Sequence, residues 1–398
     1  MANSAMIIVR MLFPGCKRSW TRQTICRIAL VLTIPFAVAG CAKQLTGVGC
    51  SMCRTPIAAP TIVQGKFVAV GDMTVARAWQ IATLLDDGKV LIAGGWGPTP
   101  VGAMGQLPQL RSAEIYDPAK QKFEVTGGMS SAHLSLAAVK LVNGNVLFIG
   151  GSSAEIYDVR SGRFEPAGSP INEMNASMAV ALGDRRVLVC DGGTNCELYF
   201  LKAGRFRETS HTQGWSPHNP TLLPDGTVLI SIVDGPGVCF ELFDPETETF
   251  RTLRSGGCAL WFALRLDDGR IFLGNEFFDP RDDSFLQAIG FLNTGGTATP
   301  LQSGKVLAAG GMGCISPTHS DQGGPQRGPN SIFRRTCMPS PTSQAWLYDP
   351  QTQTEVEIED MNARRFGHSA TRLQDGTVLL AGGTNGTATQ SSAEIYVP

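Results

Sequence analysis

Cationic and imidazole side chains recur at fixed places in this chain. Arg77, His133 and Arg365 each follow a methionine by four residues, and His218 and His368 each precede an Asp-Gly pair by seven. Guanidinium and imidazolium groups bind anions through charge-assisted hydrogen bonds. The pattern predicts a partly cationic site for an anionic ligand, with no obvious carboxylate on neighbouring strands to pair with the arginines. The alternative is that these side chains only tie neighbouring loops together.

Two tryptophans, Trp96 and Trp215, lie in segments close to these residues and could add stacking surfaces. A shallow aromatic face would favour a binding module. Three or more ionisable groups that converge in one pocket would instead favour an enzyme. Both classes stay open at this point.

Metal, phosphate and redox chemistry find little support in the sequence. The five histidines show no close spacing of the kind that zinc sites use. No glycine-rich phosphate loop or nucleophile elbow is present. Cys50 and Cys53 have a redox spacing without a thioredoxin-like context, so a local disulfide is favoured over catalysis. We therefore expect no metal, no cofactor and no assigned catalytic residue.

An apolar run from Ile28 to Val38 follows five positive charges and ends in Val-Ala-Gly-Cys41. A run of about 11 residues is too short to span a bilayer and suits the core of a signal peptide. The quartet resembles the lipobox of bacterial lipoproteins, which implies that Cys41 carries a lipid. We expect residues 1–40 to be a signal, 41–60 a tether, and the protein to be exported to the bacterial cell envelope, on the outer membrane.

Eight cysteines follow Cys41, and an even number in an exported chain suggests disulfides. The candidates for pairing are Cys50 with Cys53, Cys190 with Cys196, Cys239 with Cys258, and Cys314 with Cys337. Cys190 and Cys196 flank a Gly-Gly turn, which predicts that they lie on adjacent strands.

A repeat organises the rest of the chain. Residues 81–95 read IATLLDDGKVLIAGG and residues 369–383 read SATRLQDGTVLLAGG, and each is followed by SAEIY. The same order occurs seven times. The Asp-Gly pairs favour tight hairpins, and the continuous apolar run after each pair indicates a strand buried on both faces. An alternating third strand and a fourth strand with one aromatic complete a four-stranded unit, which is typical of a propeller blade.

The Asp-Gly hairpin, the Gly-Gly pair, the AE-x-YDP strand and the aromatic fourth strand resemble bacterial kelch repeats over residues 61–398. The resemblance implies an all-β, seven-bladed propeller. A spare segment, residues 62–71, is expected to pair with residues 392–397 and close the ring. The enlarged loops 96–111 and 312–344 should then stand on the same rim as the connections between blades.

Relatives of galactose oxidase share this fold and use two tyrosines and two histidines to hold copper. All five tyrosines of this chain occupy the same third-strand position of the repeat, which makes copper-radical oxidation very unlikely.

Charge limits the partners. Without residues 1–40 the chain has 28 Lys and Arg against 34 Asp and Glu, a net charge of −6, which argues against nucleic acid. We expect a noncatalytic module that binds a protein or glycan, anionic in charge, through the loop face around the central channel. The alternative is a sugar-acting lyase, hydrolase or isomerase with its site at the channel mouth.

Overall fold

A computed structural model describes most of the repeat region. The described residues are 65–98, 108–132, 136–234, 237–253, 263–266, 268–274, 276–287, 296–315 and 338–398. They all fall in one compact unit, Ile62–Pro398. The expected signal, the tether and Cys41 lie outside the described residues.

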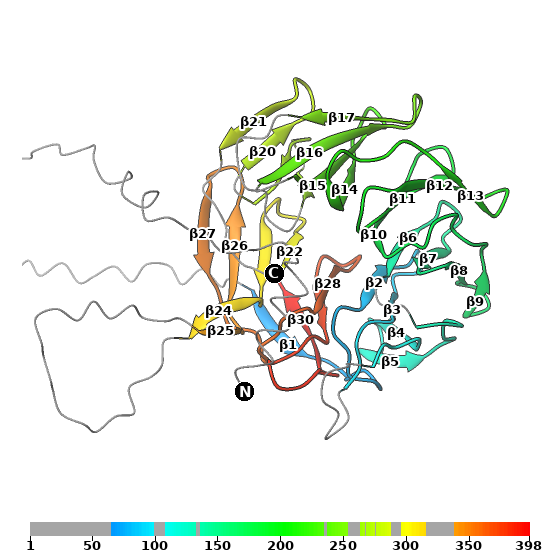
Figure 1. Ribbon diagram of the computed structural model, residues 1–398. Helices are drawn as coiled ribbons and strands as arrows, with labels where there is room; N and C mark the ends of the chain where they lie inside the picture. The colour runs from blue at the N-terminus through cyan, green and yellow to red at the C-terminus, as the bar shows by residue number, and fades with distance from the viewer. Residues whose placement is uncertain are drawn as a thin grey trace, which may run out of the picture. The chain divides into compact units, whose positions relative to one another are not determined.

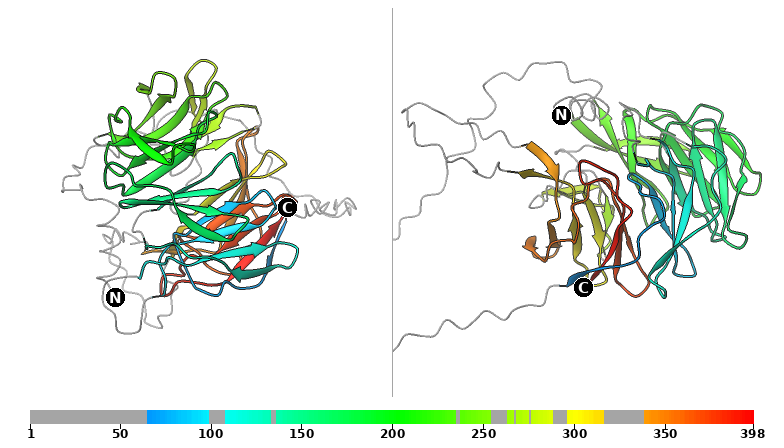
Figure 2. Two further views of the ribbon diagram at one scale, coloured as in Figure 1. Left: turned by 90° about the vertical axis from the view of Figure 1, so that its right-hand side faces the viewer. Right: turned by 90° about the horizontal axis from the view of Figure 1, so that it is seen from below.

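Seven four-stranded antiparallel sheets make up the unit, so the prediction of a seven-bladed, all-β propeller is confirmed (Figures 1 and 2). Blade 1 consists of β2 (Ile81–Leu84), β3 (Val90–Ala93), β4 (Ala113–Asp117) and β5 (Lys122–Val125). Blade 2 consists of β6 (Ala137–Lys140), β7 (Val146–Gly150), β8 (Ser153–Asp158) and β9 (Arg163–Pro166). Blade 3 consists of β10 (Ala176–Ala181), β11 (Arg186–Asp191), β12 (Cys196–Phe200) and β13 (Arg205–Glu208).

The remaining blades continue in chain order. Blade 4 consists of β14 (Trp215–Leu222), β15 (Val228–Asp234), β16 (Gly237–Asp244) and β17 (Thr249–Leu253). Blade 5 consists of β18 (Leu264–Arg265), β19 (Ile271–Phe272), β20 (Glu276–Asp279) and β21 (Ser284–Gln287). Blade 6 consists of β22 (Thr297–Pro300), β23 (Val306–Ala309), β26 (Ala345–Asp349) and β27 (Thr354–Glu357). Blade 7 consists of β28 (Ser369–Arg372), β29 (Val378–Ala381), β30 (Ala393–Val397) and β1 (Lys66–Ala69).

The two ends of the repeat region meet in blade 7. β1 pairs antiparallel with β30, with Lys66 opposite Val397 and Ala69 opposite Glu394. The predicted closure of the ring by the segment 62–71 is therefore confirmed for Lys66–Ala69, while residues 62–64 lie outside the described residues. Closure removes the exposed edge that an incomplete last blade would present.

The second strand of each blade packs against both neighbouring blades. All four residues of β3 are buried. Val90 and Ile92 contact the core shared with blade 7, while Leu91 and Ala93 contact the core shared with blade 2. Seven such clusters join the seven pairs of neighbouring blades. Each fully buried Val, Leu or Ile contributes roughly 1.5–3 kcal/mol, so the continuous apolar runs hold the ring together.

Side chains of the third strand point alternately toward the two neighbouring blades, rather than alternately toward the core and the solvent. Ala113 belongs to the core between blades 1 and 2, and Tyr116 to the core between blades 7 and 1. All five tyrosines are at most 2% exposed. Four of them pack on the aromatic ring of the next strand, as Tyr116 does on Phe123 at 4.9 Å between ring centroids. The tyrosines thus serve packing between blades.

The antiparallel order gives the ring two faces. The turns between first and second strands, and between third and fourth strands, lie on one face, which we call the hairpin face. The loops between second and third strands, and the connections between blades, lie on the other, the connection face. In Figure 1, first strands such as β2, β10 and β28 lie toward the centre and fourth strands such as β5 and β13 lie at the periphery.

The long loop of blade 6 begins and ends as a hairpin. β24 (Met312–Ile315) pairs with β25 (Met338–Pro341), so the predicted loop 312–344 has a two-stranded base at the connection face. Within the described ranges, no helix is long and apolar enough to cross a membrane.

Candidate binding face at the blade connections

Arg77 lies in the connection that leads into blade 1 and is fully buried. Its guanidinium donates to Glu114 Oε1 at 2.8 Å, to Ser112 Oγ at 3.1 Å, and to the carbonyl oxygens of Gly94 and Ser112, each at 3.0 Å. Burial lowers the pKa of Arg77, and the hydrogen bond and charge of Glu114 oppose that shift. Arginine stays protonated in proteins, so the pair is ionic.

Arg365 repeats the same arrangement in the connection that leads into blade 7. Its guanidinium donates to Glu394 Oε1 at 2.9 Å, to Ser392 Oγ at 3.1 Å, and to the carbonyl oxygens of Gly382 and Ser392, each at 2.8 Å. The expectation that these arginines lack a carboxylate on a neighbouring strand is wrong. Glu114 and Glu394 are the glutamates of two of the three SAEIY segments, and both are buried.

The third-strand glutamate is a repeated anchor for the connections. Its carboxylate accepts backbone N–H groups from the segment that leads into its own blade. The pairs are Glu114 with Thr74 and Val75, Glu155 with Ser130, Glu197 with Ile171 and Asn172, Glu241 with Gln213, and Glu394 with Asn362. Sequence reasoning missed this role, although a glutamate inside a buried strand was a visible signal that a partner had to exist.

The arginine connections also join each blade to the one before it. The N–H of Gly383, in blade 7, donates to the carbonyl oxygen of Arg77 at 2.8 Å, and Gly311, in blade 6, donates in the same way to Arg365. A Cβ on Gly382 would lie 2.4 Å from the Arg77 carbonyl oxygen. The Gly-Gly pair is therefore needed because the neighbouring backbone approaches it closely.

His368 and Gln80 occupy equivalent places three residues after the two arginines. Gln80 Nε2 donates across to blade 7, to the Ala381 carbonyl oxygen at 2.8 Å. His368 Nε2 lies 3.1 Å from Thr297 Oγ1 of blade 6. Burial, together with the charge of Arg365, lowers the pKa of His368 to about 3, so the imidazole is neutral at physiological pH. A neutral, buried imidazole is a poor anion site.

Three aromatic rings meet above the joint between blades 7 and 1. The Trp79 ring packs edge-on against Trp96 at 6.4 Å and against Phe366 at 5.5 Å. Trp79 remains 43% exposed, whereas Trp96 and Phe366 are half-buried. Trp79 was not predicted as a site residue, while Trp96 was.

Trp79 adopts a left-handed backbone conformation with φ of 53°. Its counterpart in the repeat that leads into blade 7 is Gly367, with φ of 64°, on which the Trp79 ring packs. A left-handed aromatic residue is uncommon, and such residues gather at functional sites. The conformation holds the ring at the connection face.

A second irregularity lies in blade 4, on the inner strand β14. Its pairing with β15 shifts register twice, between Trp215 and His218 and between His218 and Thr221. Ser216 and Asn219, each followed by proline, have φ of 49° and 50° at these shifts. The two β-bulges leave Trp215 60% exposed at the connection end of the strand.

His218 is half-buried beside this exposed tryptophan. Its Nδ1–H donates to the Ser216 carbonyl oxygen at 2.6 Å, and burial lowers its pKa. Of the predicted site residues, Arg77, Arg365 and His368 belong to the joints between blades, Trp96 to the aromatic cluster, and Trp215 and His218 to blade 4. His133 lies outside the described residues.

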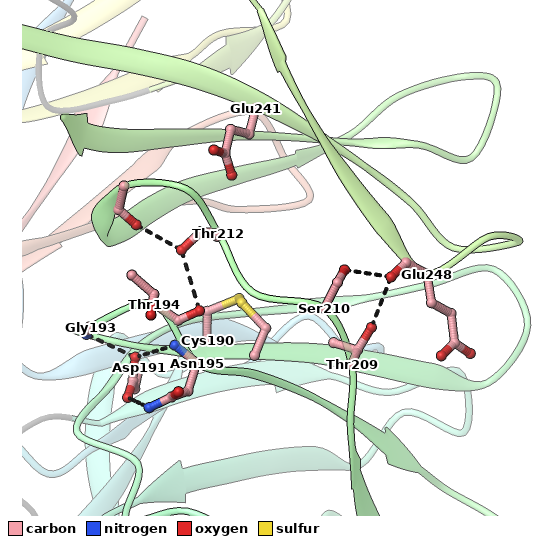
Figure 3. Close-up of a disulfide and its surroundings, with 12 residues drawn as sticks. Cys190, Asp191, Gly193, Thr194, Asn195, Thr209, Ser210, Thr212, Glu241 and Glu248 are labelled. Atoms are coloured by element: carbon pink, nitrogen blue, oxygen red, sulfur yellow. Dashed lines mark hydrogen bonds between the residues drawn. A yellow bond between two sulfur atoms is a disulfide. The ribbon is translucent and has the colours of Figure 1, made fainter.

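Cys190 and Cys196 form a disulfide between β11 and β12, as predicted (Figure 3). They are directly opposite in register. Blades 1, 6 and 7 have a pair of alanines at this place, as with Ala93 opposite Ala113. Cys50, Cys53, Cys258 and Cys337 lie outside the described residues, as do the side chains of Cys239 and Cys314, so their pairing stays a prediction.

Comparison with known proteins supports the fold. No protein-family model matches the chain. A protein of Arabidopsis thaliana, described as an F-box/kelch-repeat protein, is 23% identical over 204 residues, which is 48% of this chain. The chain spans 58% of the length of that relative.

Two solved structures are similar in fold. A fungal alcohol oxidase of the AA5 family, in complex with copper, matches with a TM-score of 0.63 at 15% identity, covering 84% of this chain and 76% of the oxidase. The extracellular domain of a hybrid two-component system from B. thetaiotaomicron matches with a TM-score of 0.55 at 11% identity, covering 83% of this chain and 42% of that chain. At these identities the likeness concerns the fold alone.

Proposed function

We propose that the protein is a noncatalytic recognition module that binds a protein or glycan through the connection face. One observation carries the proposal: Trp79 is held half-exposed, in a left-handed conformation, against Trp96 and Phe366. Tryptophan supplies a large, rigid contact area and is enriched among residues that dominate binding energy. Trp215 on blade 4 offers a second exposed ring at the same face.

The polar groups beneath this face favour binding over catalysis. Arg77 and Arg365 are buried and donate to glutamate and to backbone carbonyls, and His368 is buried and neutral. Because all three side chains are buried, they are not accessible to an anionic ligand at the surface. The proposed ligand therefore contacts an aromatic surface. The arginine joints beneath it hold the connections in place but present no charge to the ligand. The alternative function, a sugar-acting enzyme, would need ionisable groups other than these for catalysis.

The matched test replaces Trp79 by glycine, the residue at the equivalent place in blade 7, Gly367. Glycine keeps the left-handed backbone and removes only the ring. Trp79→Gly and Trp215→Ala would be screened with the parent on a glycan array and against immobilised envelope proteins, alongside thermal unfolding. Ligands lost on Trp79→Gly at unchanged Tm would support the proposal. A ligand retained by both variants would contradict it.

We further propose that the module is an exported lipoprotein of the bacterial envelope, held at the outer membrane through Cys41. The sequence Val38-Ala39-Gly40-Cys41 after a charged and apolar segment supports this proposal. Stable anchoring needs more than one acyl chain. Cys41→Ser should move the protein from the membrane fraction to the soluble fraction, and unchanged partitioning would contradict the anchor.

A further inference from the structure

On the hairpin face, the first turns of successive blades touch one another in a chain. Gln302 of blade 6 packs over Gly376, the turn glycine of blade 7. Gln374 of blade 7 donates to the Asp86 carbonyl oxygen of blade 1 at 3.2 Å. The Asp86 carboxylate accepts from Lys140 of blade 2 at 2.8 Å. The second residue of each of these turns thus covers the turn of the next blade.

This chain of contacts runs from blade 6 to blade 2 and stops between blades 2 and 3; it does not resume at the turns of blades 4 and 5, where a Cβ on Gly226 or Gly269 would meet no atom within 4 Å. The second residue of the blade 2 turn is Val142, which cannot hydrogen-bond and is 72% exposed. The corresponding residue of blade 3 is Gly183, around which a Cβ would meet no atom within 4 Å. The joint between blades 2 and 3 is therefore left open at the hairpin face.

Blade 3 also departs from the repeat at the turn itself. Six hairpin turns place a glycine in the left-handed region, with φ between 77° and 89°; these are Gly88, Gly144, Gly226, Gly269, Gly304 and Gly376. Blade 3 places Arg185 there, with φ of 69°. A side chain other than glycine is strained in this conformation, so the local structure gives no reason for an arginine.

A cleft of about 170 Å³ lies at this open joint. Leu141, Val142, Leu182 and Leu201 supply apolar walls, and Arg185 lies at its border. Ligand pockets for whole small molecules occupy roughly 300–1,000 Å³. The cleft is smaller, and its size suits a single side chain with one neighbouring polar group.

The charges around the cleft leave one cation available. Lys140 pairs with Asp86, and Arg186 pairs with Asp184 and Glu248. Arg185 is exposed and has no acidic partner among the described residues. An unpaired guanidinium beside an apolar cleft complements a carboxylate that adjoins an aliphatic group.

We propose that this cleft binds a short peptide segment of a partner protein, with an aliphatic side chain between blades 2 and 3 and the carboxylate of an adjacent Asp or Glu on Arg185. The site lies on the face opposite the aromatic cluster and does not depend on it. It would let the propeller contact a second partner while the connection face is occupied.

The test uses two variants that restore the repeat. Arg185→Gly installs the residue found at six other turns, and Val142→Gln installs the residue found at this place in blades 6 and 7. Neither variant disturbs a core residue, so both should fold with a Tm equal to or above that of the parent. Acetylated peptides containing Leu-Glu would be titrated and followed by methyl resonances of Val142 and Leu182. Peptides containing Leu-Gln or Ala-Glu serve as controls.

The Leu-Glu peptide should bind the parent and lose about tenfold in affinity with either variant and with either control peptide. Trp79→Gly should leave this binding unchanged, which separates it from the proposed function. Equal binding of Leu-Glu and Leu-Gln peptides, equal binding by the parent and Arg185→Gly, or no shift of cleft resonances would overturn the proposal.

Discussion

Blades 7 and 1 and blades 4 and 5 come from the same repeat but are held differently at their connections. In blades 7 and 1, an arginine meets the third-strand glutamate, and the inner strands β28 and β2 pair without interruption. In blade 4, Glu241 accepts the backbone N–H of Gln213, and β14 is bulged twice. In blade 5, burial raises the pKa of Glu276, and β18 has two residues.

The same repeat therefore exposes aromatic side chains in two different ways. Where the arginine fixes the connection, the inner strand is regular, and exposed rings sit above it. In blade 4, where Glu241 meets no arginine of this kind, the inner strand itself bends and carries Trp215 to the surface. Rigid joints on one side of the ring thus coexist with irregular backbone on the other. We expect ligand binding at both places, because each exposes an aromatic ring.

The largest effect should follow from breaking an arginine joint. Arg77→Ala would leave the Glu114 carboxylate buried without its cation, which costs about 3–5 kcal/mol in the free energy of unfolding. The control is Arg207→Ala, which breaks the more exposed ion pair with Glu248 and should cost less than about 1 kcal/mol. Denaturant unfolding measures both. Similar small losses would mean that the buried pair does not hold the joint.

The disulfide of blade 3 should matter next. Cys190→Ala with Cys196→Ala recreates the alanine pair of blades 1, 6 and 7, so packing changes little. Loss of the crosslink over a short loop should lower the free energy of unfolding by about 2 kcal/mol. Adding dithiothreitol should lower the free energy of unfolding of the parent by about 2 kcal/mol more than that of the double variant, because only the parent contains the Cys190–Cys196 bridge. A parent that is insensitive to complete reduction would contradict this.

The pH dependence of stability should distinguish the two connections that carry an arginine. The folded pKa of His368 is lowered to about 3, below its unfolded value, so the unfolded state binds more protons as the pH falls. Stability from this group is therefore full above about pH 6.5 and declines toward pH 3, with a slope of about 1.4 kcal/mol per pH unit. His368→Gln, which copies Gln80 of blade 1, should remove that slope between pH 6.5 and 5. Identical pH profiles would contradict a buried neutral imidazole.

The smallest effect concerns the turns. Arg185→Gly relieves a strained residue and should raise the free energy of unfolding by about 1 kcal/mol. The reciprocal change, Gly88→Arg in blade 1, should lower it by a similar amount or more, because the Gln374 side chain adjoins that turn. Thermal unfolding of both variants gives the comparison. A destabilised Arg185→Gly would show that Arg185 supports blade 3.

The repeat made the ring predictable, because seven copies of one hairpin pattern specify both the blades and their order. The spacing also singled out Arg77 and Arg365, which the structure places in two equivalent buried joints; their predicted role in ligand binding stays a prediction. Their partners escaped prediction because Glu114 lies 37 residues after Arg77 and the strand pattern does not tell which buried side chains meet.

Backbone conformation explains the other omissions. The exposure of Trp79 depends on a left-handed φ that residue spacing does not reveal. Alignment of ARAWQ at 76–80 with RRFGH at 364–368 would have placed Trp79 opposite Gly367, which is the available signal. The bulges of β14 had a comparable signal in the consecutive Ser-Pro and Asn-Pro pairs at 216–217 and 219–220.

The pairing of β1 with β30 also affects the order in which the blades can form during folding. β1 is the first described strand to be synthesised and its partner β30 is the last, so the contact between them forms only after the strands of all the other blades have been made. Contacts of long range are slow to form because the chain must lose loop entropy first. Until then blade 7 lacks its outer strand, and β30 offers an open edge to proteases and to other chains. Pulling on the chain ahead of Lys66 would load this same seam, so the last strand to dock is also the first that mechanical force would detach.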